Sequence, residues 1–458
     1  MTKALETIQA MDRILKARSI ALVGASNDPA KFGYTTLDCL IKGGFKGTIY
    51  PVNPKGGTIL GLRVYPSLSD LPGQIDAAVV IVPAKAVPGV LREAARKGAA
   101  GAIVCSGGFR EAGRPDLEAE LIAAAKETGL RLMGPNIAGV NYLPNQMCAM
   151  FFPVITTLGP LAVIGQSGTV TNALSEWAAD EGFGISAAIN LGNQVDICEA
   201  DYLDYFAADT QTKAIVMYLE GVKDGRRFFE SLKRAAAQKP VAIYKAGRTL
   251  AGRRSAASHT GSLASSHEVF AAACRQAGAF AADDLEALYD AAKGLAAIKP
   301  PSGNRVLSIS SSGGAGTLAA DQIEAWGLSM PVLPRELADE LKPHLSPLAT
   351  LANPVDLVSI AAEDFRKVAL VADAAGLYDL ILINFGDPVV GASELVEELA
   401  AKLKASLAVN YFAGGEEEKL GRLKMSRAGF AVFSSPGRAI RGIGAAVWRA
   451  GWRRHRLD

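Results

Sequence analysis

Short runs rich in β-branched residues alternate with Ala-rich stretches of helical character from one end of the chain to the other. This alternation is typical of α/β domains built on parallel sheets. The predicted strands, each with the turn that follows it, lie at residues 19–26, 48–54, 77–84, 101–108 and 131–136, then 160–168, 184–192, 214–221 and 241–247, and finally 305–316, 380–386, 407–415 and 431–435.

These strands fall into three groups, and each group predicts one α/β domain. At about 150 residues per domain, a chain of 458 residues suggests three domains. We place the first at 1–150, before an irregular stretch broken by prolines, and the second at 151–298. A linker with the sequence KPPSGN at 299–304 precedes the third, at 305–458.

Composition and charge argue against several classes of protein. The 48 basic and 46 acidic residues nearly balance, which argues against a protein that coats nucleic acid. The five cysteines occur singly and form no cluster with the four histidines, so we expect neither a disulfide framework nor a metal site. The N-terminus lacks the apolar core of a signal peptide, and no apolar run approaches the ~20 residues of a membrane span. We therefore expect a cytoplasmic protein.

The first strand-to-helix turn, residues 24–33, opens on Gly24 and predicts a nucleotide-binding site. The dinucleotide fingerprint GxGxxG requires a second glycine where Ser26 stands, and the acid that would bind a ribose after the second strand is absent. Lys55 stands there and favours a phosphate. The turn suits an ADP-like ligand with an extra phosphate, either NADP or coenzyme A (CoA). A tight turn that serves only packing is the alternative.

Three further strand ends offer backbone N–H groups to an anion. They are Ser106-Gly107-Gly108, Gln166-Ser167-Gly168-Thr169 and Ser312-Gly313-Gly314-Ala315-Gly316. The last two precede helical stretches, and helix N-termini carry unpaired N–H groups and positive partial charge that attract phosphoryl groups.

His259 is the candidate nucleophile for such a phosphoryl group. It lies in a loop of Ala, Gly and Ser residues that permits close approach and motion, beyond the carboxyl end of a predicted strand. A neutral imidazole attacks phosphorus well when a carboxylate orients its other nitrogen. Glu220, at the end of a strand of the same sheet, is the candidate for that carboxylate; an acid at a helix N-terminus is its alternative reading. We place His267 at the surface.

Several of these segments resemble the α subunits of ADP-forming (NDP-forming) acetyl-CoA synthetases and, more distantly, of succinyl-CoA synthetases. The resemblance covers the whole chain in order. It is carried by Gly24-Ala25-Ser26, Gly134-Pro135-Asn136, Gln166-Ser167-Gly168, Glu220-Gly221-Val222, Ser258-His259-Thr260-Gly261-Ser262 and Asn353-Pro354-Val355-Asp356.

The resemblance implies a Rossmann-like CoA-binding domain followed by two flavodoxin-like domains. It also implies the reversible conversion of acyl-CoA, phosphate and ADP into free acid, CoA and ATP, by way of an acyl phosphate and a phosphohistidine. His259 would carry the phosphoryl group, and the carboxylate of Glu220 would orient the imidazole of His259. Two helix starts would hold that group, through Gln166, Ser167 and Gly168 on one side and Gly314, Ala315 and Gly316 on the other.

The resemblance further implies which residues bind CoA. These are expected to be Gly24, Ala25, Ser26, Lys31, Phe32, Asn53, Lys55, Val82, Pro83, Ser106, Gly107, Gly134, Pro135 and Asn136. The last three would lie toward the thioester. Ile137 follows them where relatives often carry Cys, which leaves the acyl group open.

The family's nucleotide site lies in an ATP-grasp module that this chain lacks. The resemblance therefore implies a separate ATP-grasp β subunit, which would bind ATP or ADP with Mg²⁺, in a heterotetramer; a fused longer protein is the alternative. Three rival functions also stay open: a CoA- or acyl-CoA-binding regulatory protein without chemistry, a CoA-binding module attached to an acyltransferase, and an NADP-dependent oxidoreductase.

Overall fold

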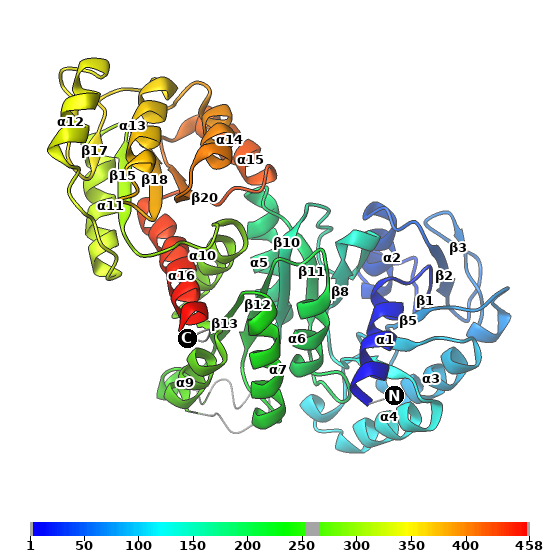
Figure 1. Cartoon of the computed structure of the whole chain (residues 1–458). Helices are drawn as coiled ribbons and strands as arrows, with labels where there is room; N and C mark the ends of the chain where they lie inside the picture. Colours follow the sequence, from blue (N-terminus) through cyan, green and yellow to red (C-terminus); the bar gives the residue numbers. More distant parts are fainter. Residues whose placement is uncertain (1–2, 253, 255–265, 456–458) are drawn as a thin grey trace. The chain divides into compact units, whose positions relative to one another are not determined.

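The structure is a computed structural model that describes residues 3–252, 254 and 266–455 (Figure 1). The predicted α/β fold is confirmed: parallel strands alternate with helices throughout. The chain divides into two compact units, Met1–Ala179 with Gly184–Ala281 and Asp180–Phe183 with Ala282–Asp458. Each unit is described separately below.

The first sheet of the first unit has five parallel strands in the order β2-β1-β5-β6-β7. They are β1 (Ser19–Val23), β2 (Thr48–Val52), β5 (Ala77–Val80), β6 (Gly101–Val104) and β7 (Arg131–Met133). Both faces are covered, which is why the strands are almost entirely apolar. Ile20 and Leu22 face the core under α1 (Lys3–Leu15) and α2 (Phe32–Lys42), whereas Ala21 and Val23 face α3 (Val87–Arg96) and α4 (Pro115–Thr128).

The second sheet has seven strands in the order β14-β13-β12-β10-β11-β8-β9. Five are parallel: β10 (Leu158–Gly165), β11 (Ile185–Asn190), β12 (Ala214–Leu219), β13 (Val241–Lys245) and β14 (Phe280–Ala281). The described helices around it are α5 (Gly168–Asp180), α6 (Glu199–Ala208), α7 (Gly225–Gln238) and α9 (His267–Ala277).

An antiparallel pair completes this second sheet: β8 (Gly139–Tyr142) and β9 (Met147–Met150), with β8 pairing to β11. The predicted first domain, 1–150, therefore contributes two strands to the second sheet. One apolar core also runs from the α1 and α2 face of the first sheet into the second sheet. A separate hairpin, β3 (Thr58–Ile59) and β4 (Leu62–Arg63), follows β2.

The second unit is built on a six-stranded sheet in the order β16-β17-β15-β18-β19-β20, parallel except for β16. Its strands are β15 (Val306–Ser310), β16 (Thr350–Leu351), β17 (Val355–Asp356), β18 (Leu380–Phe385), β19 (Ser406–Tyr411) and β20 (Val432–Phe433). Its helices are α10 (Leu285–Ala297), α11 (Gly313–Ala325), α12 (Arg335–Leu341), α13 (Ala362–Ala374), α14 (Ala392–Lys402), α15 (Gly415–Arg427) and α16 (Pro436–Arg454). One core lies under α13 and α14, and another under α11 and α16.

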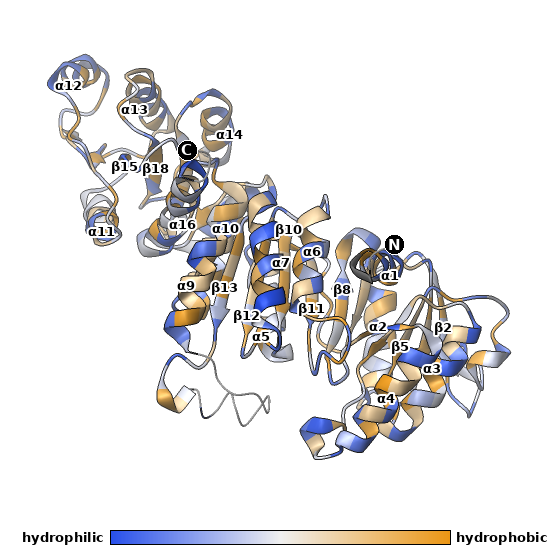
Figure 2. Cartoon of the chain, turned by 60° about the horizontal axis from the view of Figure 1, so that its bottom comes forward, coloured by the Kyte–Doolittle hydropathy of each residue, from blue (hydrophilic) through white to orange (hydrophobic). Residues whose placement is uncertain are grey.

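Hydropathy follows this layering. Figure 2 shows apolar colour on the strands, while helices such as α7 also carry strongly polar positions. None of the helices in the described ranges is long and apolar enough to cross a bilayer.

Candidate functional site

The turn after β1 is pressed against the ends of the neighbouring strands. The N–H of Gly24 donates to the carbonyl of Val52 over 3.0 Å. A Cβ on Gly24 would lie 2.0 Å from the carbonyl oxygen of Ile81, and its φ of 99° also favours glycine. Gly33 brings α2 equally close, since its Cβ would lie 2.0 Å from the carbonyl oxygen of Gly24. Glycine is therefore required where β1, β2, β5 and α2 converge.

Polar side chains fix the rest of this turn. The Oγ of Ser26 accepts the N–H two residues further on over 3.0 Å. Asn53 donates from Nδ2 to the carbonyl of Ala25 over 2.8 Å and accepts the N–H of Lys55 over 2.9 Å. Lys31 and Lys55 are both exposed. Asn53 therefore links the ends of β1 and β2 and fixes the backbone that carries Lys55.

Two aromatic rings and the turn after β5 extend this edge. Phe32 is 57% exposed and stacks on Phe151, with ring centroids 4.1 Å apart. The N–H of Val82 donates to the Oγ of buried Ser106 over 3.1 Å, while Pro83 is exposed. Ser106 therefore holds the turn after β5 to the end of β6.

The turn after β7 meets the turn after β6. The N–H of Asn136 donates to the carbonyl of Ser106 over 2.9 Å, and a Cβ on exposed Gly107 would lie 3.2 Å from the Oδ1 of Asn136. Gly134 and Pro135 are buried, whereas Asn136 is exposed with a φ of 60°. All the CoA-binding residues predicted from the sequence therefore lie at or beyond the carboxyl edge of the first sheet.

The loop that follows β11 of the second sheet runs along the end of β7 of the first. The N–H of Asn193 donates to the carbonyl of Pro135 over 2.9 Å, and that of Val195 to the carbonyl of Gly134 over 3.1 Å. Residues 192–197 thus join the carboxyl edges of the two sheets at the turn predicted to lie toward the thioester.

An ion pair reinforces this junction. Arg131 donates from Nη2 and Nε to the two carboxylate oxygens of Asp196 over 2.6 and 2.7 Å. Their side chains are only 16% and 25% exposed. Burial lowers the pKa of Arg131, but the hydrogen bonds to Asp196 outweigh burial and raise it, so the guanidinium stays charged.

The side chain of Asn193 is the centre of a polar group at this junction. Its Nδ2 donates to Glu111 over 2.6 Å and to Glu118 over 3.1 Å, and its Oδ1 accepts from Nδ2 of Asn136 over 3.3 Å. Burial raises the pKa of Glu111, yet the bonds from Asn193 and from two backbone N–H groups lower it overall. Glu111 is therefore an ionised part of the group.

Gln166 and Glu220 meet at the carboxyl edge of the second sheet. Gln166 donates from Nε2 to the carbonyl of Gly221 over 2.8 Å, and its Oε1 accepts the N–H groups of Glu220 and Gly221. Glu220 is 7% exposed. Burial and the nearby Glu220 carboxylate raise the pKa of Tyr218 to about 12. The side chain of Gln166 is therefore engaged by the loop after β12 and fixes the backbone of Glu220.

Ser167 and Gly168 lie where α5 begins. Asn190 donates to the carbonyl of Gly165 over 3.0 Å and accepts the N–H of Ala138 over 2.7 Å. A Cβ on Gly168 would lie 3.1 Å from the Cβ of Ala138. The turn at residues 134–136, predicted to lie toward the thioester, is the thioester-end turn. The helix start predicted to hold a phosphoryl group is therefore tied, through Asn190, to the segment that follows this turn.

The second predicted helix start lies in the second unit, where α11 begins at Gly313. Gly314 is exposed, with open space around the position of a Cβ, and Ala315 is buried. The N–H of Gly316 donates to the carbonyl of Ser312 over 3.2 Å. Gly316 therefore belongs to the hydrogen-bond ladder of the helix, and its N–H is not open to an anion.

The Asn-Pro-Val-Asp segment of the resemblance supports this helix start. Asn353 donates from Nδ2 to the carbonyls of Val306 and Pro331 over 2.8 and 2.9 Å. The Oδ2 of Asp356 lies 2.9 Å from the position that a Cβ on Gly313 would take. Asn353 therefore holds β15 to the segment at Pro331, and Asp356 lies next to the start of α11.

The comparisons with known proteins agree with this arrangement. Residues 18–143 match the CoA binding domain, and residues 158–295 match the succinyl-CoA ligase like flavodoxin domain. The chain is 37% identical to the α subunit of acetate–CoA ligase [ADP-forming] I of Pyrococcus furiosus, over 97% of this chain and 98% of that one. The chain belongs to the α subunits of the ADP-forming acetate–CoA ligases.

Further relatives of this α subunit extend the match. The acetate–CoA ligase [ADP-forming] I of Archaeoglobus fulgidus is 36% identical over 94% of this chain, which spans 63% of that protein. The dinucleotide forming acetyl-coenzyme A synthetase 1 of Ca. Korarchaeum cryptofilum, solved with phosphate and ADP, superposes with a TM-score of 0.89 at 33% identity over 98% of each chain. The resemblance inferred from the motifs and the predicted acid–CoA ligase class are confirmed.

His259, the predicted nucleophile of this α subunit, lies outside the described residues. Sequence reasoning missed Asn193 and Lys223, which occupy the junction of the two sheets. Both follow predicted strands, 184–192 and 214–221, and of these two strand ends only the second had been singled out, through Glu220; the available signal was position beyond a strand's carboxyl end. In the described part of the chain, no group of three or more His, Cys, Asp or Glu residues could hold a metal ion.

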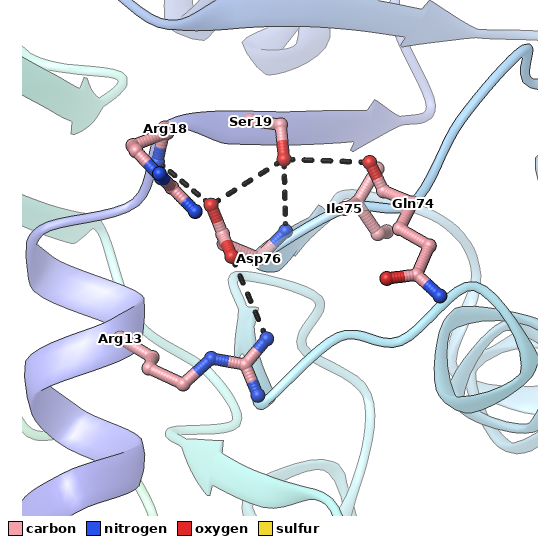
Figure 3. A pocket seen from close by; sticks show the side chains of 6 residues that line it. All are labelled: Arg13, Arg18, Ser19, Gln74, Ile75 and Asp76. Atoms are coloured by element: carbon pink, nitrogen blue, oxygen red, sulfur yellow. Dashed lines mark hydrogen bonds and ion pairs between the residues drawn. The ribbon is translucent and has the colours of Figure 1, made fainter.

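A surface hollow lies at the opposite edge of the first sheet, at the amino ends of β1 and β5 (Figure 3). The carboxylate of Asp76 accepts the N–H of Arg18 over 2.9 Å and pairs with Arg13 over 3.5 Å. Because Asp76 is engaged by the polypeptide itself, this hollow serves to hold strand ends together and is separate from the site.

Proposed function

We propose that this α subunit catalyses the acyl-CoA half of an ADP-forming ligase: acyl-CoA, phosphate and ADP give acid, CoA and ATP, reversibly. The observation that carries the proposal is the junction within the first unit. It connects the thioester-end turn at Asn136 with the helix start at Gln166 and Glu220 through residues 190–197. A phosphate ion between these ends would lie close to both the thioester and the phosphoryl acceptor.

The chemistry runs in three balanced steps. A phosphate oxygen attacks the thioester carbonyl carbon; the C–O bond forms, the C–S bond breaks, and CoA leaves as a thiolate that takes up a proton. A nitrogen of His259 then attacks phosphorus, and the free carboxylate leaves. ADP finally accepts the phosphoryl group and restores the imidazole.

The described residues support these steps in distinct ways. The first N–H groups of α5, at Gly168 and Thr169, would offer their partial positive charge to a phosphate bound at the start of the helix. Gln166 fixes the backbone of Glu220, which we assign to orient His259. Both groups are held before the substrate arrives, and such preorganisation lowers the barrier.

The CoA site that we propose lies along the carboxyl edge of the first sheet. The turn at Gly24, Ala25 and Ser26 would receive the pyrophosphate, and exposed Lys31 and Lys55 would meet the phosphates of the ADP-like end. Asn136 would face the thioester. We also keep as a proposal the division into three domains at residues 1–150, 151–298 and 305–458.

We also propose the partner and the setting. The Pyrococcus furiosus relative is named as an α subunit, and the Archaeoglobus fulgidus relative is longer than this chain. An ATP-grasp β subunit would therefore supply the site for ADP and Mg²⁺, in a heterotetramer. The five cysteines are all free, which fits a cytoplasmic location.

Thermal unfolding and thiol release test the proposal. CoA should raise the melting temperature of the chain and NADP should not, because ligand binding stabilises the folded state according to affinity. The chain should release CoA thiol from an acyl-CoA only when phosphate or arsenate is added. Stabilisation by NADP alone, or thiol release that is independent of both anions, would overturn the assignment.

A further inference from the structure

Lys223 places a positive charge at the junction between the thioester-end turn, residues 134–136, and the loop after β12 that carries Glu220. It follows β12 three residues after Glu220. Its Nζ donates to the carbonyl of Asn193 over 2.5 Å and to that of Gln194 over 3.2 Å. Asn193 in turn contacts Asn136 and Pro135. The ammonium group therefore lies on the loop that borders the thioester-end turn.

The ammonium group of Lys223 retains capacity to bind an anion. An ammonium has three N–H donors, and two are used by backbone carbonyls, which fix its position without neutralising its charge. Among the described residues, Lys223 makes no ion pair within 4.0 Å of a carboxylate. The nearby Glu118 is paired with Arg110 over 2.8 Å.

Glu199 is a second unsatisfied group in the same surroundings. It is the first residue of α6, only 2% exposed, and its Oε2 has no hydrogen-bond partner in the described structure. Burial raises the pKa of Glu199 and lowers that of Lys223. The charges of Glu118 and Glu199 favour the charged form of Lys223, but neither carboxylate forms an ion pair with its ammonium group.

We propose that Lys223 binds the phosphate ion, and then the phosphoryl end of the acyl phosphate, at the thioester end of the site. This proposal rests on the proposed function and deepens it. The start of α5 offers only the partial charge of a helix N-terminus, about half an elementary charge. A full positive charge on the loop at residues 193–194, beside the turn at residues 134–136, would attract the anionic nucleophile and balance the charge that develops when it attacks.

Equilibrium dialysis of the full chain with inorganic phosphate, in the presence of saturating CoA, tests this role. Lys223→Met should weaken phosphate binding about tenfold or more, because a charge-assisted hydrogen bond is lost. Lys223→Arg should restore most of it. The affinity for CoA, measured on the same variants, should stay unchanged.

Lys239→Met is the matched control. Lys239 also donates to two backbone carbonyls, those of Phe206 and Asp209, and burial lowers its pKa as well, yet it precedes β13 at the opposite edge of the sheet. It should leave phosphate binding unchanged. If Lys223 had a purely structural role, Lys223→Met and Lys239→Met would change the affinity for phosphate by the same amount, or Lys223→Met would weaken CoA and phosphate binding together.

The pH dependence provides a readout that folding does not supply. Lys223 is faced by Glu118 on α4, Glu199 on α6, Arg110 after β6 and Cys198. The residue as a whole is exposed, but partial loss of water around its ammonium group is the largest effect and lowers its pKa below the ordinary 10.5. Phosphate affinity of the wild type should therefore fall as pH rises through that lowered pKa, while Lys223→Arg keeps its affinity.

The outcomes separate this inference from the proposed function. Unchanged phosphate binding in Lys223→Met, or no phosphate binding by a wild type that still binds CoA, overturns the role of Lys223 and leaves the CoA assignment standing. Failure of the wild type to bind CoA overturns both.

Discussion

Single residues determine the geometry at the carboxyl edge of the first sheet because the backbone there has no free space. A Cβ on Gly24 would lie 2.0 Å from the carbonyl oxygen of Ile81, and a Cβ on Gly33 would lie 2.0 Å from the carbonyl oxygen of Gly24. Asn53 ties the adjacent turn by two hydrogen bonds. The requirement for glycine at Gly24 is thus steric, whatever ligand binds beside it.

Gly24→Ala should lower the free energy of unfolding by about 2 kcal/mol or more, because the new Cβ would overlap the carbonyl of Ile81 at a φ that disfavours side chains. It should also abolish CoA binding. Gly89→Ala is the control: Gly89 lies within α3, with open space at its Cβ, and alanine there should raise stability by up to ~1 kcal/mol. Denaturant unfolding measures both, and equal stability of the two variants would contradict the steric account.

At this scale the sequence predicted which turns matter but not how their side chains are used. Gln166 and Glu220 were both singled out, and the structure links them directly. The N–H of Gly316 was expected to face a phosphate but belongs to the helix ladder, because the register of α11 is set one residue earlier than the glycine pattern suggests. Lys223 lies one residue beyond the quoted Glu220-Gly221-Val222, and a lone lysine in a loop has no pattern that reveals its partners.

At the scale of secondary-structure elements, the junction between the two sheets of the first unit holds the parts of the candidate site together. The loop after β11 hydrogen-bonds along β7 and is clamped by Arg131 and Asp196. Together with the backbone bonds from Asn193 and Val195 and the side chain of Asn190, this ion pair holds residues 134–136 in place relative to the start of α5. The ion pair is mostly buried, so removing one partner leaves the other charge poorly solvated.

Arg131→Met should therefore lower the free energy of unfolding by about 3 kcal/mol and weaken phosphate-dependent thiol release more than CoA binding. The control is Arg92→Met, since Arg92 and Glu127 form an ion pair whose side chains are 42% and 57% exposed. That variant should change stability by less than ~1 kcal/mol. Urea unfolding with CoA titration distinguishes them, and similar losses in both variants would show that the junction is not special.

Strand prediction succeeded where apolar runs are short and bounded by glycine, as in β1, β6 and β10. It missed β8 and β9, because the stretch between Gly139 and Met150 contains a proline and polar residues that suggest irregular structure. Tertiary pairing with β11 overrides this local signal. The predicted linker at 299–304 is also ordered in part, since Ser302 donates to Asp379 over 2.7 Å.

At the scale of the whole molecule, two compact units share one chain in an interleaved way. The segment Asp180–Phe183 belongs with the second unit, although the rest of α5 before it and β11 after it belong to the first. Its Glu181 accepts hydrogen bonds from buried Lys293 over 2.6 Å and from Arg438 over 2.7 Å. No composition change marks this segment, so the sequence alone could not assign it.

The function proposed for the whole molecule requires that the phosphoryl group leave the acyl site on a histidine. Intact-protein mass measured after incubation with acyl-CoA and phosphate, for the wild type beside His259→Ala, tests this most directly. The account predicts an acid-labile gain of one phosphoryl group on the wild type alone, with CoA binding retained by both. An equal gain on His259→Ala, or no gain on the wild type even after an ATP-grasp β subunit is added, would contradict it.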